Sequence, residues 1–126
     1  MIYELSQRFY FEAAHTLERE IDADASRRIH GHTYHAEVTL RGQPDARSGM
    51  VMDLGHFRQR LDEVKQLLDH RLLDEVEGLG LPTLEGLCAF IAQQLIDQLP
   101  GLVAVTLRRD ASGDSCRLLV GWLRSG

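Results

Sequence analysis

The chain has few of the residues that mark disulfide-linked, membrane-spanning or nucleic-acid-binding proteins. Its 126 residues include only two cysteines, Cys88 and Cys116, which are too few for a disulfide framework and form no C-x-x-C metal motif. Acidic residues outnumber basic ones by 19 to 14, and this balance argues against a nucleic-acid partner. No apolar run reaches membrane-spanning length, and no basic region with an apolar signal core opens the chain. We therefore expect a cytoplasmic protein that binds neither membranes nor nucleic acids.

The sequence contains enough apolar residues to bury a core. Hydrophobic residues make up 44% of the chain, an ordinary share for a globular protein. The length of 126 residues suits one domain that folds without disulfides or structural metals. We expect a single domain over residues 1–126.

Two regular alternations near the N-terminus predict strands. In residues 2–14 apolar side chains such as Phe9, Phe11 and Ala13 take every second position, as in a half-buried strand. Residues 33–40 alternate in the same way. Residues 16–28 between them are polar with no clear period, and we expect a loop over the functional site there.

Two amphipathic helices are predicted in the middle of the chain. From Leu54 to about Asp69, apolar residues recur at helical spacing, and Asp53 stands in a good N-cap position. A second helix is expected after Pro82, with Thr83 as its cap and with Pro100 and Gly101 as its stop.

Two more strands are expected at the C-terminal end, over residues 102–109 and 116–123, joined by a hairpin loop over residues 110–114. The predicted order is strand, strand, helix, helix, strand, strand (ββααββ). We therefore expect an α+β fold in which four antiparallel strands carry both helices on one face. Such a sheet has unpaired edges, which favour a ring-like oligomer.

Three histidines form the candidate metal site. His30 and His32 lie two residues apart, so on an extended strand both imidazoles face the same side. His15 ends the preceding strand and can reach the same point if the two strands pair. Three imidazoles with one open position are typical of a catalytic zinc site. Histidines of a small protein are more often plain surface or core residues, so this pattern alone leaves both interpretations open.

Several short motifs are similar to one known family. They are residues 11–15 (Phe-Glu-Ala-Ala-His), 30–34 (His-Gly-His-Thr-Tyr), 52–54 (Met-Asp-Leu), 68–70 (Leu-Asp-His) and 82–85 (Pro-Thr-Leu-Glu). The chain resembles the 6-pyruvoyl-tetrahydropterin synthase family, and within it the bacterial 6-carboxy-tetrahydropterin synthases of the queuosine pathway. The resemblance runs nearly end to end.

The resemblance implies a fold, a cofactor and a reaction. The fold is the tunnelling fold, in which trimers close a barrel, two trimers stack as a homohexamer and active sites lie between subunits. Zn2+ would be bound by His15, His30 and His32, while Asp69 and His70 would relay protons. The substrate would be 7,8-dihydroneopterin triphosphate, converted to 6-carboxy-tetrahydropterin or a related tetrahydropterin with side-chain cleavage and loss of the triphosphate.

The substrate would lie near Thr83 and Glu85, which belong to the matching motif. Two other positions depart from the family pattern. Ser26 stands where the family has its catalytic cysteine, and a serine hydroxyl is a far weaker base than a thiolate. The glutamate that anchors the pterin is replaced by Arg109 or by Asp110, depending on how the last strands align. Only Asp110 could supply a carboxylate in its place.

Two alternatives to a synthase remain open from the sequence. The first is a related protein of altered or absent activity, which binds zinc and a pterin or purine without turnover. The second is a cupin, because His30, His32 and Glu37 imitate its first metal motif. However, Glu37 is at odd spacing from His32 and would face the other side of a regular strand.

Overall fold

The computed structural model of the chain describes residues 1–16 and 30–121. Ser26 and nearly all of the loop predicted over residues 16–28 lie outside this part of the chain, and so does the side chain of His30. The order of elements is β1 (Tyr3–His15), β2 (His30–Gly42), α2 (Leu54–Leu68), β3 (Arg71–Leu72), the short 3-10 helix η1 (Leu73–Glu75), α3 (Leu84–Leu95), β4 (Leu102–Arg109) and β5 (Asp114–Leu119).

The described strands form one mixed sheet in the order β3-β1-β2-β4-β5. The neighbours from β1 to β5 are antiparallel, whereas β3 runs parallel to β1 through the pair Ala13 and Arg71 and the pair Ala14 and Leu72. The four predicted strands form and are antiparallel, but the prediction missed a fifth, parallel strand that makes the sheet mixed. A two-residue strand has too little alternation to be recognised in the sequence.

The chain reaches β3 through an unusual backbone conformation at His70. Its φ of 58° is the only positive φ of a non-glycine residue in the described part of the chain. Its backbone N–H donates a hydrogen bond of 2.6 Å to the carbonyl of Glu12 in β1. A left-handed residue directly after α2 thus redirects the chain and places Arg71 beside the end of β1.

The long pair of strands β1 and β2 carries the alternation expected from the sequence. Phe9, Phe11 and Ala13 are buried on one face, and Phe11 is opposite Tyr34 in the register. Strand β2 begins at His30, three residues before the predicted start. Strand β5 covers Asp114–Leu119 and so begins two residues before the predicted range of 116–123, of which residues 122 and 123 lie outside the described part of the chain.

Both predicted helices form and begin at the predicted caps. Asp53 accepts a hydrogen bond of 2.9 Å from the backbone N–H of His56, and Thr83 accepts one of 3.0 Å from that of Gly86. Helix α3 ends at Leu95, before the predicted stop at Pro100, and a turn through Gly101 leads into β4. The buried stripes are made by Phe57, Leu61, Val64 and Leu68 of α2 and by Leu87, Cys88, Ile91 and Leu95 of α3.

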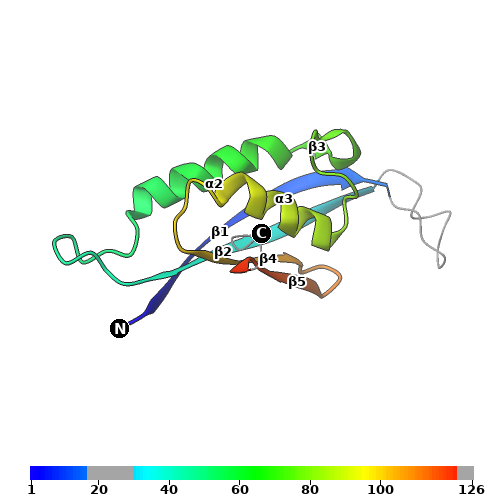
Figure 1. Ribbon diagram of the computed structural model, residues 1–126. Helices are drawn as coiled ribbons and strands as arrows, with labels where there is room; N and C mark the ends of the chain where they lie inside the picture. Colours follow the sequence, from blue (N-terminus) through cyan, green and yellow to red (C-terminus); the bar gives the residue numbers. More distant parts are fainter. Residues whose placement is uncertain (17–29, 122–126) are drawn as a thin grey trace.

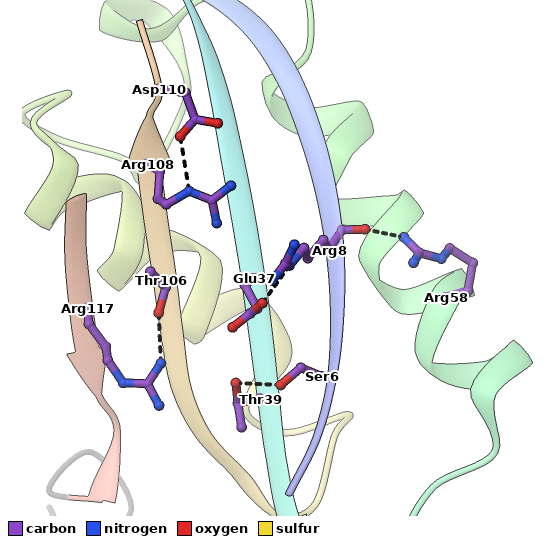
Figure 2. Close-up of polar contacts among 9 residues, drawn as sticks. All are labelled: Ser6, Arg8, Glu37, Thr39, Arg58, Thr106, Arg108, Asp110 and Arg117. Carbon is purple, nitrogen blue, oxygen red and sulfur yellow. Dashed lines mark hydrogen bonds and ion pairs between the residues drawn. The ribbon is translucent and has the colours of Figure 1, made fainter. Parts of the chain in front are cut away.

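The sheet has one apolar face and one polar face. Both helices lie on the apolar face, as expected, and the core is between them and the strands (Figure 1). Polar side chains of β1, β2, β4 and β5 form contacts across the other face (Figure 2). These include the ion pair of Arg8 with Glu37 at 2.6 Å and the hydrogen bond of Arg117 to Thr106 at 2.9 Å. No helix in the described residues is long and apolar enough to cross a membrane.

Candidate active site

Two of the three candidate metal ligands lie together at the ends of β1 and β2. His15 and His32 are on the helix-covered side of the sheet, because both continue the alternation of the buried residues Ala13 and Tyr34. Their ring centroids are 4.9 Å apart, and His15 is only 1% exposed. His30 is the register partner of His15 on β2. The pairing of β1 with β2 therefore brings the backbone positions of all three histidines to one end of the sheet.

Two neighbouring imidazoles have the donor chemistry that a zinc ion prefers. Among the described side chains no group of three His, Cys, Asp or Glu residues is placed to hold a metal. The predicted third ligand, His30, has no described side chain. His15 and His32 thus fit zinc in residue type and in proximity, and a complete site would require His30.

Arg109 is a charged neighbour of this histidine pair. Its Nη1 lies 3.4 Å from Nε2 of His32, and since a guanidinium only donates, this contact uses the lone pair of Nε2. Its Nη2 donates to Asp114 across the β4–β5 hairpin at 2.8 Å, and Ser112 also donates to that carboxylate at 2.9 Å. The hairpin therefore holds the guanidinium toward His32.

Tyr34 completes this side of the site. It is 1% exposed and stacks on Phe11 with ring centroids 5.0 Å apart. Burial raises the pKa of the Tyr34 hydroxyl to about 12, although the nearby charge of Arg109 lowers it. The hydroxyl and the Nε of Arg109 are both buried, and neither has a hydrogen-bond partner within the described residues. Buried polar groups in this state are costly unless a ligand or water meets them.

A cavity of about 180 Å3 lies in front of these groups. Its wall is made by the ends of β1, β2 and β4 and by the start of α3. The lining residues are His15, Tyr34, Pro82, Thr83, Leu84, Glu85 and Arg109. The structure therefore brings four of the residues selected from the sequence, His15, Thr83, Glu85 and Arg109, to one cavity.

The close approach of the α3 entry to the cavity depends on Gly86. A Cβ on Gly86 would overlap the backbone carbonyl oxygen of Leu81. Only glycine lets the chain before Pro82 fold back onto the first turn of α3. This tight entry fixes Thr83 and Glu85 at the edge of the cavity.

Asp69 and His70 form the second group of predicted residues. Nδ1 of His70 lies 3.0 Å from Oδ2 of Asp69. The other oxygen, Oδ1, accepts a hydrogen bond of 2.9 Å from the backbone N–H of Glu12. This hydrogen bond is the largest influence on the carboxyl and, together with His70, holds the pKa of Asp69 below its ordinary value. The carboxylate is thus kept charged beside the imidazole.

This pair lies beside the opposite face of the strands, although His70 and His32 both line one further cavity at the end of the sheet. Nε2 of His70 lies 3.9 Å from the carboxylate of Glu12, and Glu12 accepts from the hydroxyl of Thr33 at 3.3 Å. Glu12 and Thr33 are exposed on the face opposite His15, as the strand alternation requires. A second cavity of about 580 Å3 lies at this end of the sheet, lined by Glu12, Ala13, Ala14, Gly31, His32, Thr33, His70, Arg71 and Leu72.

The two candidates for the pterin anchor also lie on opposite faces. Asp110 is on the polar face, where Arg108 contacts it at 3.1 Å (Figure 2) and His35 at 3.7 Å. The contact with Arg108 holds the pKa of Asp110 below its ordinary value. Of the two, only Arg109 lines the cavity beside His15.

Sequence reasoning missed Tyr34 and Asp114 as site residues. Tyr34 stands two positions after His32, so the strand period alone places both side chains on one face. The role of Asp114 depends on the register of β4 with β5, in which it is opposite Arg109. No pattern in the sequence marks that pairing.

Comparison with known proteins agrees with the motifs. A family model described as 6-pyruvoyl tetrahydropterin synthase matches residues 4–117. The chain belongs to this family. It is 36% identical over 105 residues to 6-carboxy-5,6,7,8-tetrahydropterin synthase of Synechocystis, and the match covers 79% of this chain and 80% of the relative. It is 33% identical over 94 residues to dihydroneopterin monophosphate aldolase of Pyrococcus furiosus, which covers 75% of each chain.

A solved structure of the family has the same fold. The structure of Caenorhabditis elegans 6-pyruvoyl tetrahydropterin synthase superposes with a TM-score of 0.80 at 27% identity, covering 94% of this chain and 96% of the other. Membership of this family implies a pterin-converting enzyme and a pterin substrate. The cupin alternative is wrong, because the two helices and the mixed sheet are those of the synthase fold.

Proposed function

We propose that this protein is a zinc-dependent lyase that converts 7,8-dihydroneopterin triphosphate to 6-carboxy-tetrahydropterin or a related tetrahydropterin. The observation that carries the proposal is the cavity in which His15, Thr83 and Glu85 meet, in a chain that belongs to a pterin-synthase family. A fused two-ring heterocycle needs such a pocket beside the metal, with its side chain extending toward the histidines.

His15, His30 and His32 would hold the zinc ion. Zinc, when bound, would polarise and acidify the hydroxyls of the substrate side chain. His70, oriented by Asp69 at 3.0 Å, is suited to accept and return protons at that side chain. Arg109 contacts Nε2 of His32, so binding of a metal through this atom requires the guanidinium to shift.

The placement of these groups on two faces of the sheet supports a site shared between copies of the chain. Glu12 and His70 would face the cavity of a neighbouring copy, in which His15 and His32 hold the metal. Along most of its length β1 has no partner on its outer edge in the described residues, because β3 covers only Ala13 and Ala14, and β5 is the other edge. We propose that edge-to-edge pairing closes a ring, as in a barrel-forming hexamer.

Two departures leave a second candidate function. Ser26 stands in place of the family cysteine, and the anchoring carboxylate is replaced in the cavity by Arg109. The similarity to dihydroneopterin monophosphate aldolase suggests a different cleavage of a related pterin as the alternative activity. A further possibility within this alternative is a protein that binds zinc and a pterin without converting the pterin.

The test is to incubate zinc-loaded protein with 7,8-dihydroneopterin triphosphate and to identify the product by mass. A 6-carboxy- or 6-pyruvoyl-tetrahydropterin that disappears with the His70→Ala variant is the expected result. A parallel incubation uses 7,8-dihydroneopterin monophosphate. Cleavage of the monophosphate, with its phosphate still on the released side-chain fragment and with the triphosphate left unconverted, would instead favour the aldolase. Recovery of both substrates unchanged from protein with bound zinc would contradict both enzyme proposals. Restoring cysteine with Ser26→Cys would then test whether the serine is responsible.

A further inference from the structure

We propose that Arg109 makes this cavity select a heterocycle by a ring carbonyl, so that the 4-oxo group of the ligand faces the guanidinium. The inference rests on the proposed function, in that the ligand is taken to be a pterin. It adds a specificity-determining residue and an orientation of the ring. At Arg109 the protein would then recognise an acceptor oxygen of the ligand and not one of its amino groups.

The guanidinium has unused donors that point at the cavity wall. It has five N–H groups, of which one meets His32 and another meets Asp114. The Nε is buried and donates to no other atom of the described residues. Asp114, itself held by Ser112, anchors Nη2 from the hairpin, so the guanidinium stays tied to the cavity wall even if Nη1 moves away from His32 when a metal binds. Rigid donors of this kind favour a ligand with a matching acceptor.

The hydroxyl of Tyr34 provides a second donor at the same wall. It is buried, lines the cavity, and has no hydrogen-bond partner within the described residues. A tyrosine hydroxyl in its ordinary protonated form is a hydrogen-bond donor. The guanidinium and the protonated hydroxyl are both hydrogen-bond donors at the same wall. A ligand with one or two acceptor atoms would form hydrogen bonds with both.

The charges around the cavity favour a neutral carbonyl over an anion. The charge of Arg109 is already balanced by Asp114 at 2.8 Å. Glu85 adds a carboxylate to the cavity wall. Among the described side chains beside Arg109 there is thus no surplus positive charge, so a phosphate or carboxylate buried against this part of the wall would be costly. A ring carbonyl accepts from the same donors at no such cost.

The geometry of the acceptor edge also suits arginine. A guanidinium binds the adjacent carbonyl oxygen and ring nitrogen of guanine through two parallel hydrogen bonds. The O4 and N5 atoms of a pterin form the same kind of edge. The 2-amino side of the ring would then be free to donate to Glu85, whose carboxylate only accepts.

The proposal can be tested with two ligands that differ in one substituent. Pterin has an oxo group at position 4, whereas 2,4-diaminopteridine has an amino group there. Binding to the zinc-loaded protein is measured by ligand fluorescence at a pH where both rings are neutral. We expect the wild-type protein to bind pterin at least about tenfold more tightly, because a buried donor facing a donor is left unsatisfied. Equal affinities would overturn the proposal.

The Arg109→Glu variant replaces the donors by an acceptor, so the preference for the 4-oxo ligand that depends on Arg109 should be lost. Arg109→Met, which removes the donors and keeps an unbranched apolar stem, should lower the ratio to near one. The matched control is Arg108→Glu, the same charge change one residue away, on the polar face beside Asp110 (Figure 2). It should leave the ratio unchanged. A preference that survives in both Arg109 variants would contradict the role of Arg109.

A second pair of ligands distinguishes a wrong ligand class from a wrong role of Arg109. If neither pteridine binds, the pair guanine and 2,6-diaminopurine repeats the oxo-to-amino comparison on a purine ring. A preference for guanine that depends on Arg109 would keep the proposed role of Arg109 and reject the pterin substrate. No binding of any of the four ligands would overturn both.

Discussion

At the scale of single residues, the carboxylate of Asp69 connects the candidate relay to the sheet. It accepts a hydrogen bond of 2.9 Å from the backbone of Glu12 and lies 3.0 Å from the imidazole of His70. Both contacts favour its charged form, so the pKa of Asp69 is lower in the folded chain than in the unfolded chain. The folded state is therefore stabilised above the ordinary pKa of 3.8, and this stabilisation is lost as the pH falls through the lowered pKa of the folded state.

The Asp69→Asn variant tests this linkage. At pH 7 we expect a lower free energy of unfolding than in the wild-type protein, by about 0.5–1 kcal/mol, because the charge is lost from a partly exposed pair. As the pH falls from the ordinary pKa through the lowered pKa of the folded state, this difference should shrink, because Asp69 becomes protonated first in the unfolded and then in the folded chain. Urea unfolding at pH 7 and in acid gives the two values. Asp62→Asn, on the exposed surface of α2, is the control. An equal loss at both pH values would show that the charge is not responsible.

Removal of the Tyr34 hydroxyl should separate binding from stability. The hydroxyl is buried and has no hydrogen-bond partner in the described part of the chain, so Tyr34→Phe leaves no new unsatisfied group. We expect a free energy of unfolding that is unchanged or higher by up to about 1 kcal/mol. Pterin affinity should fall by about tenfold if the hydroxyl donates to the ligand. A large loss of stability in thermal unfolding would mean that the hydroxyl already has a partner inside the protein.

At the scale of elements, the two helix caps have the same chemistry but different positions. Thr83 caps α3 at the wall of the small cavity, whereas Asp53 caps α2. Thr83→Ala and Asp53→Ala should each lower the free energy of unfolding by about 1 kcal/mol. Only Thr83→Ala should also weaken pterin binding, because it loosens the entry of α3 beside Glu85. Isothermal titration calorimetry measures the pterin affinity of both variants. If the two substitutions change this affinity equally, the start of α3 has no specific role in binding.

The elements also show which parts of the fold the sequence could predict. Strand β1 and helices α2 and α3 follow from local periodicity and from caps at Asp53 and Thr83, which act within one turn. Strand β3 could not be predicted, because it consists of two residues whose pairing depends on the backbone of His70 reaching Glu12. Its existence is a consequence of tertiary contacts and not of local sequence.

The site shows the same division between local and long-range information. His15 and His32 were found from motif spacing and strand period, and the structure places their rings 4.9 Å apart. The choice between Arg109 and Asp110 remained open because a shift of one residue along β4 exchanges the two faces of the sheet. The pairing of β4 with β2, which aligns Arg108 with His35, settles which face each residue occupies.

At the scale of the whole molecule, the two groups of candidate residues lie on different faces of one sheet. His15 and Arg109 line the small cavity on the helix-covered side, whereas His70 contacts Glu12 on the opposite side. His32 contacts Arg109 and also lines the larger cavity that His70 lines. A site that uses both groups is completed most simply by a second copy of the chain. The unpaired outer edges of β1 and β5 offer the surface through which copies could join.

The measurement that tests this account most directly is complementation between two variants. His32→Ala removes a candidate metal ligand, and His70→Ala removes the candidate proton carrier, so each variant alone should be inactive on 7,8-dihydroneopterin triphosphate. When the two are mixed, dissociated and reassembled, sites that combine an intact His32 from one copy with an intact His70 from another should form. Random assembly predicts about a quarter of the wild-type activity. If the reassembled mixture stays inactive while wild-type protein recovers its activity after the same treatment, the site is not shared between copies and the central claim is contradicted.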